Sequence, residues 1–151
     1  MGLVIRSSSI HAAGCYTMRR IKKGARICEY DGPRMSKAVA DLRYEGRFVT
    51  YLFACGGDQV IDGFGTPMFF NHCCDPNCET EQDEDNRIFI VAIRDIKAGE
   101  ELTYEYNLYD SDDESQDCYC GAANCRGTMF SDMELKRRAR RAKRAEANGT
   151  R

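Results

Sequence analysis

Nine cysteines in a chain of 151 residues make metal binding the first chemistry to consider. The stretch CYCGAANC, residues 118–125, places three of them on one tight turn: Cys118, Cys120 and Cys125. Structural zinc takes four tetrahedral ligands at about 2.0–2.3 Å. The turn therefore predicts a zinc site that still needs one ligand, which a residue far away in the sequence must supply.

A second cysteine-rich stretch, NHCCDPNC at residues 71–78, offers candidates for that fourth ligand. Three cysteines among mostly polar residues have little apolar core to join, although free cysteine is often buried. The stretch also contains His72, which could be a zinc ligand, a core histidine, or the base of a Cys–His hydrolase dyad. The residues alone leave these roles open. The candidate thiols are those of Cys73, Cys74 and Cys78.

The composition limits what kind of protein this is. With 42% apolar and 30% charged residues, we expect one soluble globular domain. No apolar run approaches the ~20 residues of a membrane span, so we expect no membrane partner. The N-terminal MGLVIRSSS lacks the apolar stretch of a signal peptide, which argues against secretion. We therefore expect reduced or metal-bound cysteines rather than a disulfide framework.

The charge is distributed unevenly along the chain. Residues 132–151 contain eight Lys and Arg against three Asp and Glu, a sum of +5. Because the whole chain carries −2, residues 1–131 sum to −7. An acidic body suits a basic partner and a basic tail suits an acidic one.

Short strands are expected to position the cysteine-rich stretches. Apolar runs separated by turn residues predict strands at LVIR, GCYTM, ARICEY, FVTYLFAC, QVID, RIFIVAIRDI and ELTYEY. Residues 36–44 are spaced like a short helix, and the acidic residues 79–86 predict an exposed loop. At residues 131–147 a C-terminal helix is predicted, because Ser131 is a suitable N-cap and Glu134 follows at capping-box spacing. The fold class is therefore mostly β.

Four blocks in this order carry a family resemblance: HAAGCYTMRRIKKGARICEYDG, FFNHCCDPNC, GEELTYEY and CYCGAANC. Together they resemble a SET domain with its cysteine-rich post-SET segment, the fold of protein-lysine methyltransferases that use S-adenosyl-L-methionine. The resemblance implies a SET β-fold of small sheets, in which pseudoknot-like threading brings NHCC and LTYEY together. The implied division is a SET domain at 1–110, a post-SET zinc-binding segment at 111–127 and a basic C-terminal helix or tail at 128–151.

The resemblance also implies roles for individual residues. Cys74 would complete the zinc site with Cys118, Cys120 and Cys125. The catalytic residues would be Tyr106, Tyr104 and Tyr51, with Tyr106 beside the transferred methyl group. A tyrosine at position 104, where the family has Phe or Tyr, favours mono- or dimethylation. The residues expected to bind S-adenosyl-L-methionine are His11, Ala13, Gly14, Tyr51, Asn71, His72 and Tyr119.

The implied chemistry explains a tyrosine-lined channel. A free lysine has a pKa near 10.4, so deprotonating it at pH 7 costs about 4.6 kcal/mol. An apolar channel lowers that cost because it disfavours the ammonium, and it also aligns the amine with the methyl group. The expected substrate is a protein that presents a lysine in a basic segment, such as a histone.

Two positions depart from the family pattern, namely Ala12 in place of a glycine and Met68 in place of a frequent arginine. If residue 12 needs a positive φ, alanine costs about 1 kcal/mol there. These departures keep open a non-catalytic SET-like binding module that retains zinc and fold. A zinc-only nucleic-acid-binding protein is a third interpretation, which ignores most of the motifs.

The basic run KRRARRAKR has three open interpretations: a solvated or partner-docking helix, a nucleic-acid contact, or a targeting signal. The location expected for the enzyme is the nucleus in a eukaryote and the cytoplasm in a prokaryote. The sequence gives no indication of oligomeric state.

Overall fold

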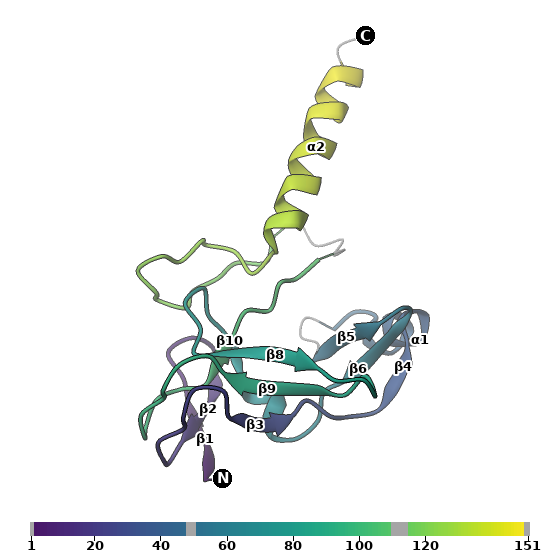
Figure 1. Ribbon diagram of the computed structural model, residues 1–151. Helices are drawn as coiled ribbons and strands as arrows, with labels where there is room; N and C mark the ends of the chain where they lie inside the picture. Colours follow the sequence, from purple (N-terminus) through teal and green to yellow (C-terminus); the bar gives the residue numbers. More distant parts are fainter. Residues whose placement is uncertain (1, 48–50, 110–114, 150–151) are drawn as a thin grey trace.

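The computed structural model describes residues 2–47, 51–109 and 115–149. Short strands dominate them, as predicted, and one long helix stands at the C-terminal end (Figure 1). The strands are β1 (Leu3–Ser7), β2 (Ala13–Thr17), β3 (Arg26–Glu29), β4 (Arg34–Ser36), β5 (Leu52–Gly56), β6 (Gln59–Asp62), β7 (Asn71–His72), β8 (Cys78–Gln82), β9 (Ile88–Ala92) and β10 (Thr103–Tyr104). The helices are α1 (Lys37–Tyr44), the 3₁₀ helix η1 (Thr66–Phe69) and α2 (Asp132–Gly149).

The described strands form four small sheets around one shared core. Three are antiparallel, with strand orders β1-β2, β3-β9-β8 and β4-β6-β5, and the fourth is the parallel pair β10-β7. Strand β9 is central in its sheet because its residues are apolar and mostly buried on both faces. The most deeply buried side chains of the core are Cys15, Ile61, Phe70, Cys78, Ile90, Ile96 and Leu102.

Most predicted elements are present, but one was wrong in part. The acidic residues 79–86 were expected to be a loop, whereas residues 79–82 belong to β8 and pair with β9. Because β8 is an edge strand, its charged side chains stay in solvent while its backbone pairs on one side. Glu81 also forms an ion pair with Arg26 of β3. The loop therefore begins only after Gln82.

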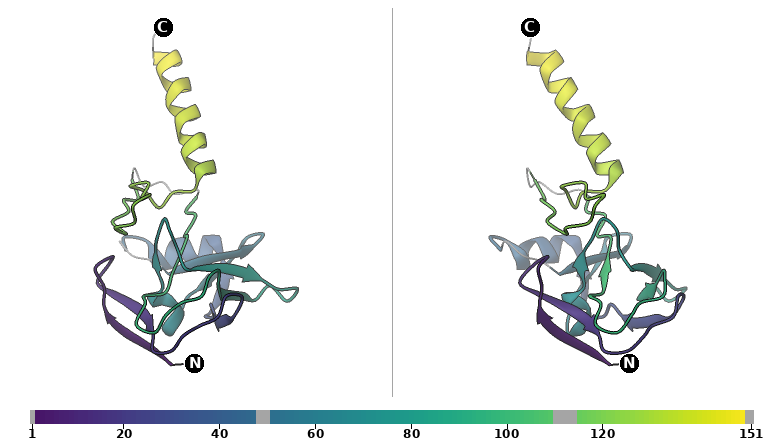
Figure 2. Two further views of the ribbon diagram at one scale, coloured as in Figure 1. Left: turned by 60° about the vertical axis from the view of Figure 1, so that its left-hand side comes forward. Right: turned by 90° about the vertical axis from the view of Figure 1, so that its left-hand side faces the viewer.

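Helix α2 rises away from the sheets in every view of Figures 1 and 2. Its predicted N-cap is confirmed, since the Ser131 hydroxyl accepts a hydrogen bond of 3.2 Å from the backbone N–H of Glu134. The buried Glu134 carboxylate accepts hydrogen bonds from Arg137 and Arg138, and the Arg138 guanidinium lies 4.0 Å from the ring centre of Phe130. These contacts anchor the base of the helix. Within the described chain, no helix combines the length and apolarity needed to cross a membrane.

Candidate active site and metal centre

The short parallel pair β7-β10 joins two stretches that are about thirty residues apart. Thr103 pairs with Asn71 and Tyr104 with His72, and the backbone N–H of Cys73 donates to the carbonyl of Tyr104 at 3.2 Å. This pairing places NHCC beside LTYEY, as the resemblance implied. The threading of the chain beneath a loop stays a prediction.

The Asn71 side chain links this pair to the start of β2. Its amide nitrogen donates to the carbonyl oxygen of Ala13 at 3.0 Å and to the Glu101 carboxylate at 2.7 Å. Both amide hydrogens are therefore used inside the chain. Any side-chain contact of Asn71 with a cofactor must use its oxygen, and its amide positions the backbone of Ala13 and Gly14.

Glu101 is a positioning residue that the sequence reasoning missed. Its half-buried carboxylate accepts hydrogen bonds from the Ser8 hydroxyl at 2.8 and 2.9 Å, from the Tyr16 hydroxyl at 2.9 Å and from Asn71. A Cβ atom on Gly14 would lie 2.0 Å from this carboxylate, so only glycine permits the approach. Glu101 thus holds the loop after β1, strand β2 and Asn71 together. The sequence feature that could have identified Glu101 is its position inside the GEELTYEY block.

We expect Glu101→Gln to lower the free energy of unfolding by about 2–3 kcal/mol. The amide nitrogen of glutamine would face donor groups, so part of the hydrogen-bond network would be left without an acceptor. Urea denaturation measures the effect. Glu100→Gln is the matched control, because Glu100 pairs with the exposed Arg94 at the surface and should cost less than about 1 kcal/mol. Equal losses in the two variants would contradict the positioning role.

His72 lies between the aromatic residues and the cysteines. The Tyr106 backbone N–H donates to its Nδ1 at 3.2 Å, so in this arrangement Nδ1 accepts and the ring proton sits on Nε2. Nε2 faces the Cys74 sulfur at 3.5 Å. Burial lowers the pKa of His72, which favours the neutral ring although Glu105 is nearby. Glu105 is instead paired with Arg126 at 2.7 Å.

An aromatic cluster extends from His72 into the core. The ring centres of Tyr104 and Tyr106 lie 4.9 Å apart, and those of His72 and Tyr106 lie 5.4 Å apart. Phe53, which the sequence reasoning did not single out, lies between Tyr104 and Tyr30, at centroid distances of 6.4 and 5.1 Å. The cluster is the apolar, tyrosine-rich environment that a lysine channel requires.

The hydroxyl groups of this cluster stay protonated at neutral pH. Burial raises the pKa of Tyr30, Tyr104 and Tyr106 well above the usual value. The Tyr106 hydroxyl donates to the carbonyl of Phe70 at 2.9 Å, and the Tyr30 hydroxyl donates to the carbonyl of Tyr51 at 2.7 Å. The same burial would disfavour an ammonium, so this environment favours a neutral lysine amine.

The cysteine cluster contains the four residues that the resemblance selected. The sulfur atoms of Cys74, Cys118, Cys120 and Cys125 all lie within 4.8 Å of one another. The Cys118 sulfur is 3.7 Å from those of both Cys74 and Cys125. A tetrahedral site with zinc–sulfur bonds of about 2.3 Å has sulfur–sulfur edges of about 3.8 Å. The donor set and its spacing therefore fit a zinc ion.

The other two cysteines of NHCCDPNC do not belong to this group of four, although the Cys73 thiol lies near that of Cys120. The Cys73 sulfur is hydrogen-bonded within its own turn, where it accepts from the backbone N–H of Asp75 at 3.4 Å. Cys78 is fully buried, and burial raises the pKa of its thiol to about 12. Within the cluster, burial opposes ionisation of Cys120, yet hydrogen bonds from the backbone of Cys74 and Ala122 lower its pKa to about 6.

Three further residues were predicted to bind the cofactor or to take part in catalysis: Tyr51, His11 and Tyr119. Tyr51 is half-buried directly before β5, and its backbone carbonyl accepts the hydrogen bond from the Tyr30 hydroxyl. His11 is exposed in the turn between β1 and β2. Tyr119 is 74% exposed, with its hydroxyl 3.3 Å from the Asp117 carboxylate. The structure brings neither His11 nor Tyr119 into the aromatic cluster.

Comparison with known proteins agrees with this geometry. The SET domain family model matches residues 12–107. The chain belongs to the SET-domain family. A histone-lysine N-methyltransferase, H3 lysine-4 specific, from Saccharomyces cerevisiae is 42% identical over 136 residues, which cover 81% of this chain and 12% of the relative. Histone-lysine N-methyltransferase trr from Drosophila melanogaster is 41% identical over 134 residues, covering 81% of this chain and 6% of the relative.

This SET-domain chain therefore spans only a small part of the length of the relatives it matches. The matched range contains β2 to β10 and the whole aromatic cluster. Cys118, Cys120 and Cys125 follow the matched range in the sequence. In the fold, their sulfur atoms lie beside that of Cys74, which is inside the matched range. The cysteine cluster thus joins the C-terminal segment to the SET domain.

The departure at Ala12 has a visible backbone consequence. Its φ is +22°, in the region where side chains other than glycine are strained. We expect Ala12→Gly to raise the free energy of unfolding by up to about 1 kcal/mol, measured by urea denaturation. Ala13→Gly is the control, because Ala13 lies in β2, where glycine should cost about 0.5–1 kcal/mol. Destabilisation by both substitutions would contradict the strain at Ala12.

Met68, the second departure, lies half-buried in η1, directly before the segment that leads into β7. It contributes none of the hydrogen bonds that hold Asn71, His72 or Glu101 among the described residues. The substitution therefore leaves the arrangement of these three side chains intact.

Proposed function

We propose that this chain transfers methyl groups from S-adenosyl-L-methionine to a lysine side chain of a histone, with the H3 tail as the first candidate. The observation that carries the proposal is the β7-β10 pairing, which places Tyr104 and Tyr106 against the Asn71–His72 pair. Membership of the SET family and the names of its histone-methylating relatives support it. The acidic body, with a net charge of −7 over residues 1–131, suits a basic histone segment.

S-adenosyl-L-methionine would supply an activated methyl group on a sulfonium. We assign its binding to His11, Ala13 and Gly14 around the start of β2, to Asn71 and His72 of β7, and to Tyr51 and Tyr119. The chain's own contribution is to orient these groups and to exclude water from the amine. Tyr106, Tyr104 and Tyr51 would line the lysine channel, where burial favours the neutral amine.

We further propose that the cysteine cluster holds one structural zinc ion. Four thiols at tetrahedral spacing leave no ligand position for water, as in structural rather than catalytic zinc sites. The His72 ring, whose Nε2 faces the Cys74 sulfur at 3.5 Å, would be oriented by this cluster. The zinc would thereby stabilise the wall of the active site without taking part in methyl transfer.

The proposed division of the chain is 1–110, 111–127 and 128–151. The first boundary falls among residues 110–114, which lie outside the described part of the chain. Backbone pairing between Asp117 and Thr128 ties the second segment to the third, and pairing between Leu108 and Phe130 ties the first segment to the third. For a eukaryotic protein with this function, the proposed location is the nucleus.

The number of methyl groups added should depend on Tyr104. Its ring is buried beside Tyr106, and its hydroxyl would occupy space that further methyl groups need. We expect Tyr104→Phe to shift the product from mono- and dimethyl-lysine towards trimethyl-lysine. Mass spectrometry of an H3 tail peptide measures the distribution, with Tyr109→Phe as an exposed control. An unchanged distribution in Tyr104→Phe would refute this role.

The function is tested by incubating the purified chain with labelled S-adenosyl-L-methionine and an H3 tail peptide. A second peptide carries arginine in place of its lysine 4. Label in the first peptide alone supports the proposal and identifies the lysine. Label in both peptides supports lysine methylation at another position. If the chain binds the cofactor but labels neither these peptides nor whole histones, histones are not its substrates.

A second candidate function is a SET-like binding module without turnover, which the strained Ala12 favours. The two hypotheses differ in cofactor binding, because a strained loop beside Gly14 weakens it. Isothermal titration with S-adenosyl-L-methionine separates them. Absence of binding by both the wild-type chain and Ala12→Gly would favour the binding module.

A further inference from the structure

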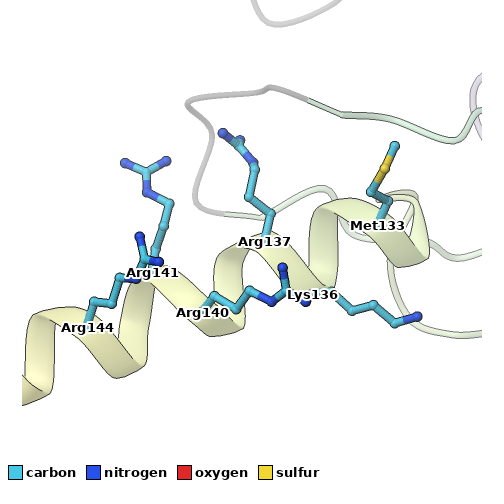
Figure 3. Close-up of a pocket in the computed structure, with 6 residues that line it drawn as sticks. All are labelled: Met133, Lys136, Arg137, Arg140, Arg141 and Arg144. Atoms are coloured by element: carbon cyan, nitrogen blue, oxygen red, sulfur yellow. The ribbon is translucent and has the colours of Figure 1, made fainter.

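Helix α2 carries a dense group of basic side chains on one face. At 3.6 residues per turn, they fall within an arc of about 160° along about 12 Å of helix. We call this group the α2 basic face, and it consists of Lys136, Arg137, Arg140, Arg141, Lys143 and Arg144. Figure 3 shows five of these side chains extending from the helix around a hollow that Met133 also borders.

Most of the α2 basic face is available for a partner. Arg137 is held by Glu134, at 2.7 Å. The other five side chains are exposed, and among the described residues none of them has an ion pair or hydrogen bond. Because the body is acidic and the helix projects away from it (Figure 2), the face can meet an anionic partner with little repulsion from the body.

After Leu135, the helix has no large apolar side chain with which to bind a partner. Beyond Leu135, its largest apolar side chain is alanine. A helix that docks in a protein groove needs large apolar anchors at i, i+3, i+4 and i+7, and a membrane-surface helix needs an apolar face. Residues 136–147 have neither, so the binding energy of this helix must come from charge.

We propose that the α2 basic face binds the phosphate backbone of double-stranded DNA without reading its sequence. Four of its six side chains are arginines, whose planar guanidinium groups match phosphate oxygens in a bidentate geometry. The major groove is about 12 Å wide and accommodates a helix. The choice of DNA over RNA rests on the proposed histone substrate, which DNA accompanies. The positive charge of the face is present whether or not the chain transfers methyl groups.

The test measures binding of the full chain to a fluorescent random-sequence DNA duplex by anisotropy, with no histone or cofactor present. Each phosphate neutralised contributes about −0.9 to the slope of log K against log salt, so contacts by the five available side chains predict a slope of about −4.5. The variant Arg140→Gln/Arg141→Gln/Arg144→Gln should reduce the slope by about 2.7 and weaken binding at least about tenfold. Glutamine keeps good helix propensity, and circular dichroism checks that the helix is retained.

The matched control removes three positive charges from the body by Arg19→Gln/Lys22→Gln/Lys23→Gln, in the exposed segment between β2 and β3, which lies away from α2 in Figure 1. Binding that is retained in this control but lost in the α2 variant supports the proposal. Equal affinities of the two variants, or stronger competition by polyglutamate or anionic vesicles than by DNA, would overturn it. A single-stranded RNA that binds more tightly than the duplex would also overturn it.

Methylation assays keep this result separate from the proposed function. The α2 variant should methylate a free H3 peptide at the wild-type rate but nucleosomes more slowly. DNA binding by a chain that methylates no histone would refute the proposed function and leave the DNA site standing. Peptide methylation by a chain that does not bind DNA would support the proposed function and refute the DNA site.

Discussion

Tyr106→Phe is expected to lower the rate of methyl transfer by about 100-fold or more while the chain remains folded. The Tyr106 hydroxyl donates to the Phe70 carbonyl at 2.9 Å, and its ring contacts both Tyr104 and His72. That hydrogen bond uses the only hydroxyl hydrogen and fixes the phenolic oxygen, and loss of one positioned polar group in an active site costs about 10²–10³ in rate. Loss of the same hydrogen bond costs the fold only about 1 kcal/mol. The effect should therefore appear in catalysis rather than in stability.

Single-turnover methylation of an H3 tail peptide measures this effect, and urea denaturation measures stability in the same preparation. The control is Tyr109→Phe, which removes a hydroxyl from a ring that is 48% exposed and lies after the aromatic cluster in the chain. We expect wild-type rates in the control and nearly unchanged cofactor affinity in Tyr106→Phe. A wild-type rate in Tyr106→Phe would remove Tyr106 from the catalytic residues.

Removing zinc is expected to abolish methyl transfer and to release the segment that contains Cys118, Cys120 and Cys125. These three thiols meet Cys74 at sulfur–sulfur distances that fit a tetrahedral ion. Without the metal nothing would join the four thiols, and among the described residues the segment would keep the Arg126–Glu105 ion pair and a few backbone hydrogen bonds to the body. Structural zinc contributes about 10–16 kcal/mol of apparent binding free energy in small zinc-dependent folds. Loss of this binding free energy should leave the segment without a stable position against the body.

Metal analysis of the purified chain should give one zinc ion per chain, and chelation should lower the melting temperature. Cys74→Ser and Cys120→Ser should each weaken zinc binding by at least about 100-fold. Cys73→Ser is the matched control, because Cys73 is adjacent in sequence to Cys74 but does not belong to the group of four. Zinc binding that survives Cys74→Ser but fails in Cys73→Ser would show that the ligand assignment is wrong.

The type of most elements followed from local sequence, but their lengths did not. Residues 36–44 formed the expected helix because Ser36 caps it, with its side chain accepting from Val39. The β-branched run at 87–96 produced a shorter strand, Ile88–Ala92, since a strand lasts only as long as its neighbours β3 and β8 pair with it. Strand pairing is a property of the sheet, and so the polar residues 79–82 also became a strand.

The cysteines illustrate how far local sequence reaches. The spacing of Cys118, Cys120 and Cys125 was sufficient to predict a zinc turn, because ligands close in sequence must be close in space. The family resemblance then added the catalytic tyrosines, the cofactor and Cys74. Without the resemblance, Cys73, Cys74 and Cys78 were equivalent candidates for the fourth ligand.

How these residues meet depends on the packing of the whole chain. The fold selects Cys74 because its sulfur belongs to the group in which all four sulfur atoms lie within 4.8 Å of one another, whereas those of Cys73 and Cys78 do not. It also reveals Glu101, whose partners Ser8, Tyr16 and Asn71 are between 30 and 93 positions away. Contacts between residues so far apart in the sequence form only when distant strands pair and pack. The pattern of residue types within a short stretch therefore cannot predict them.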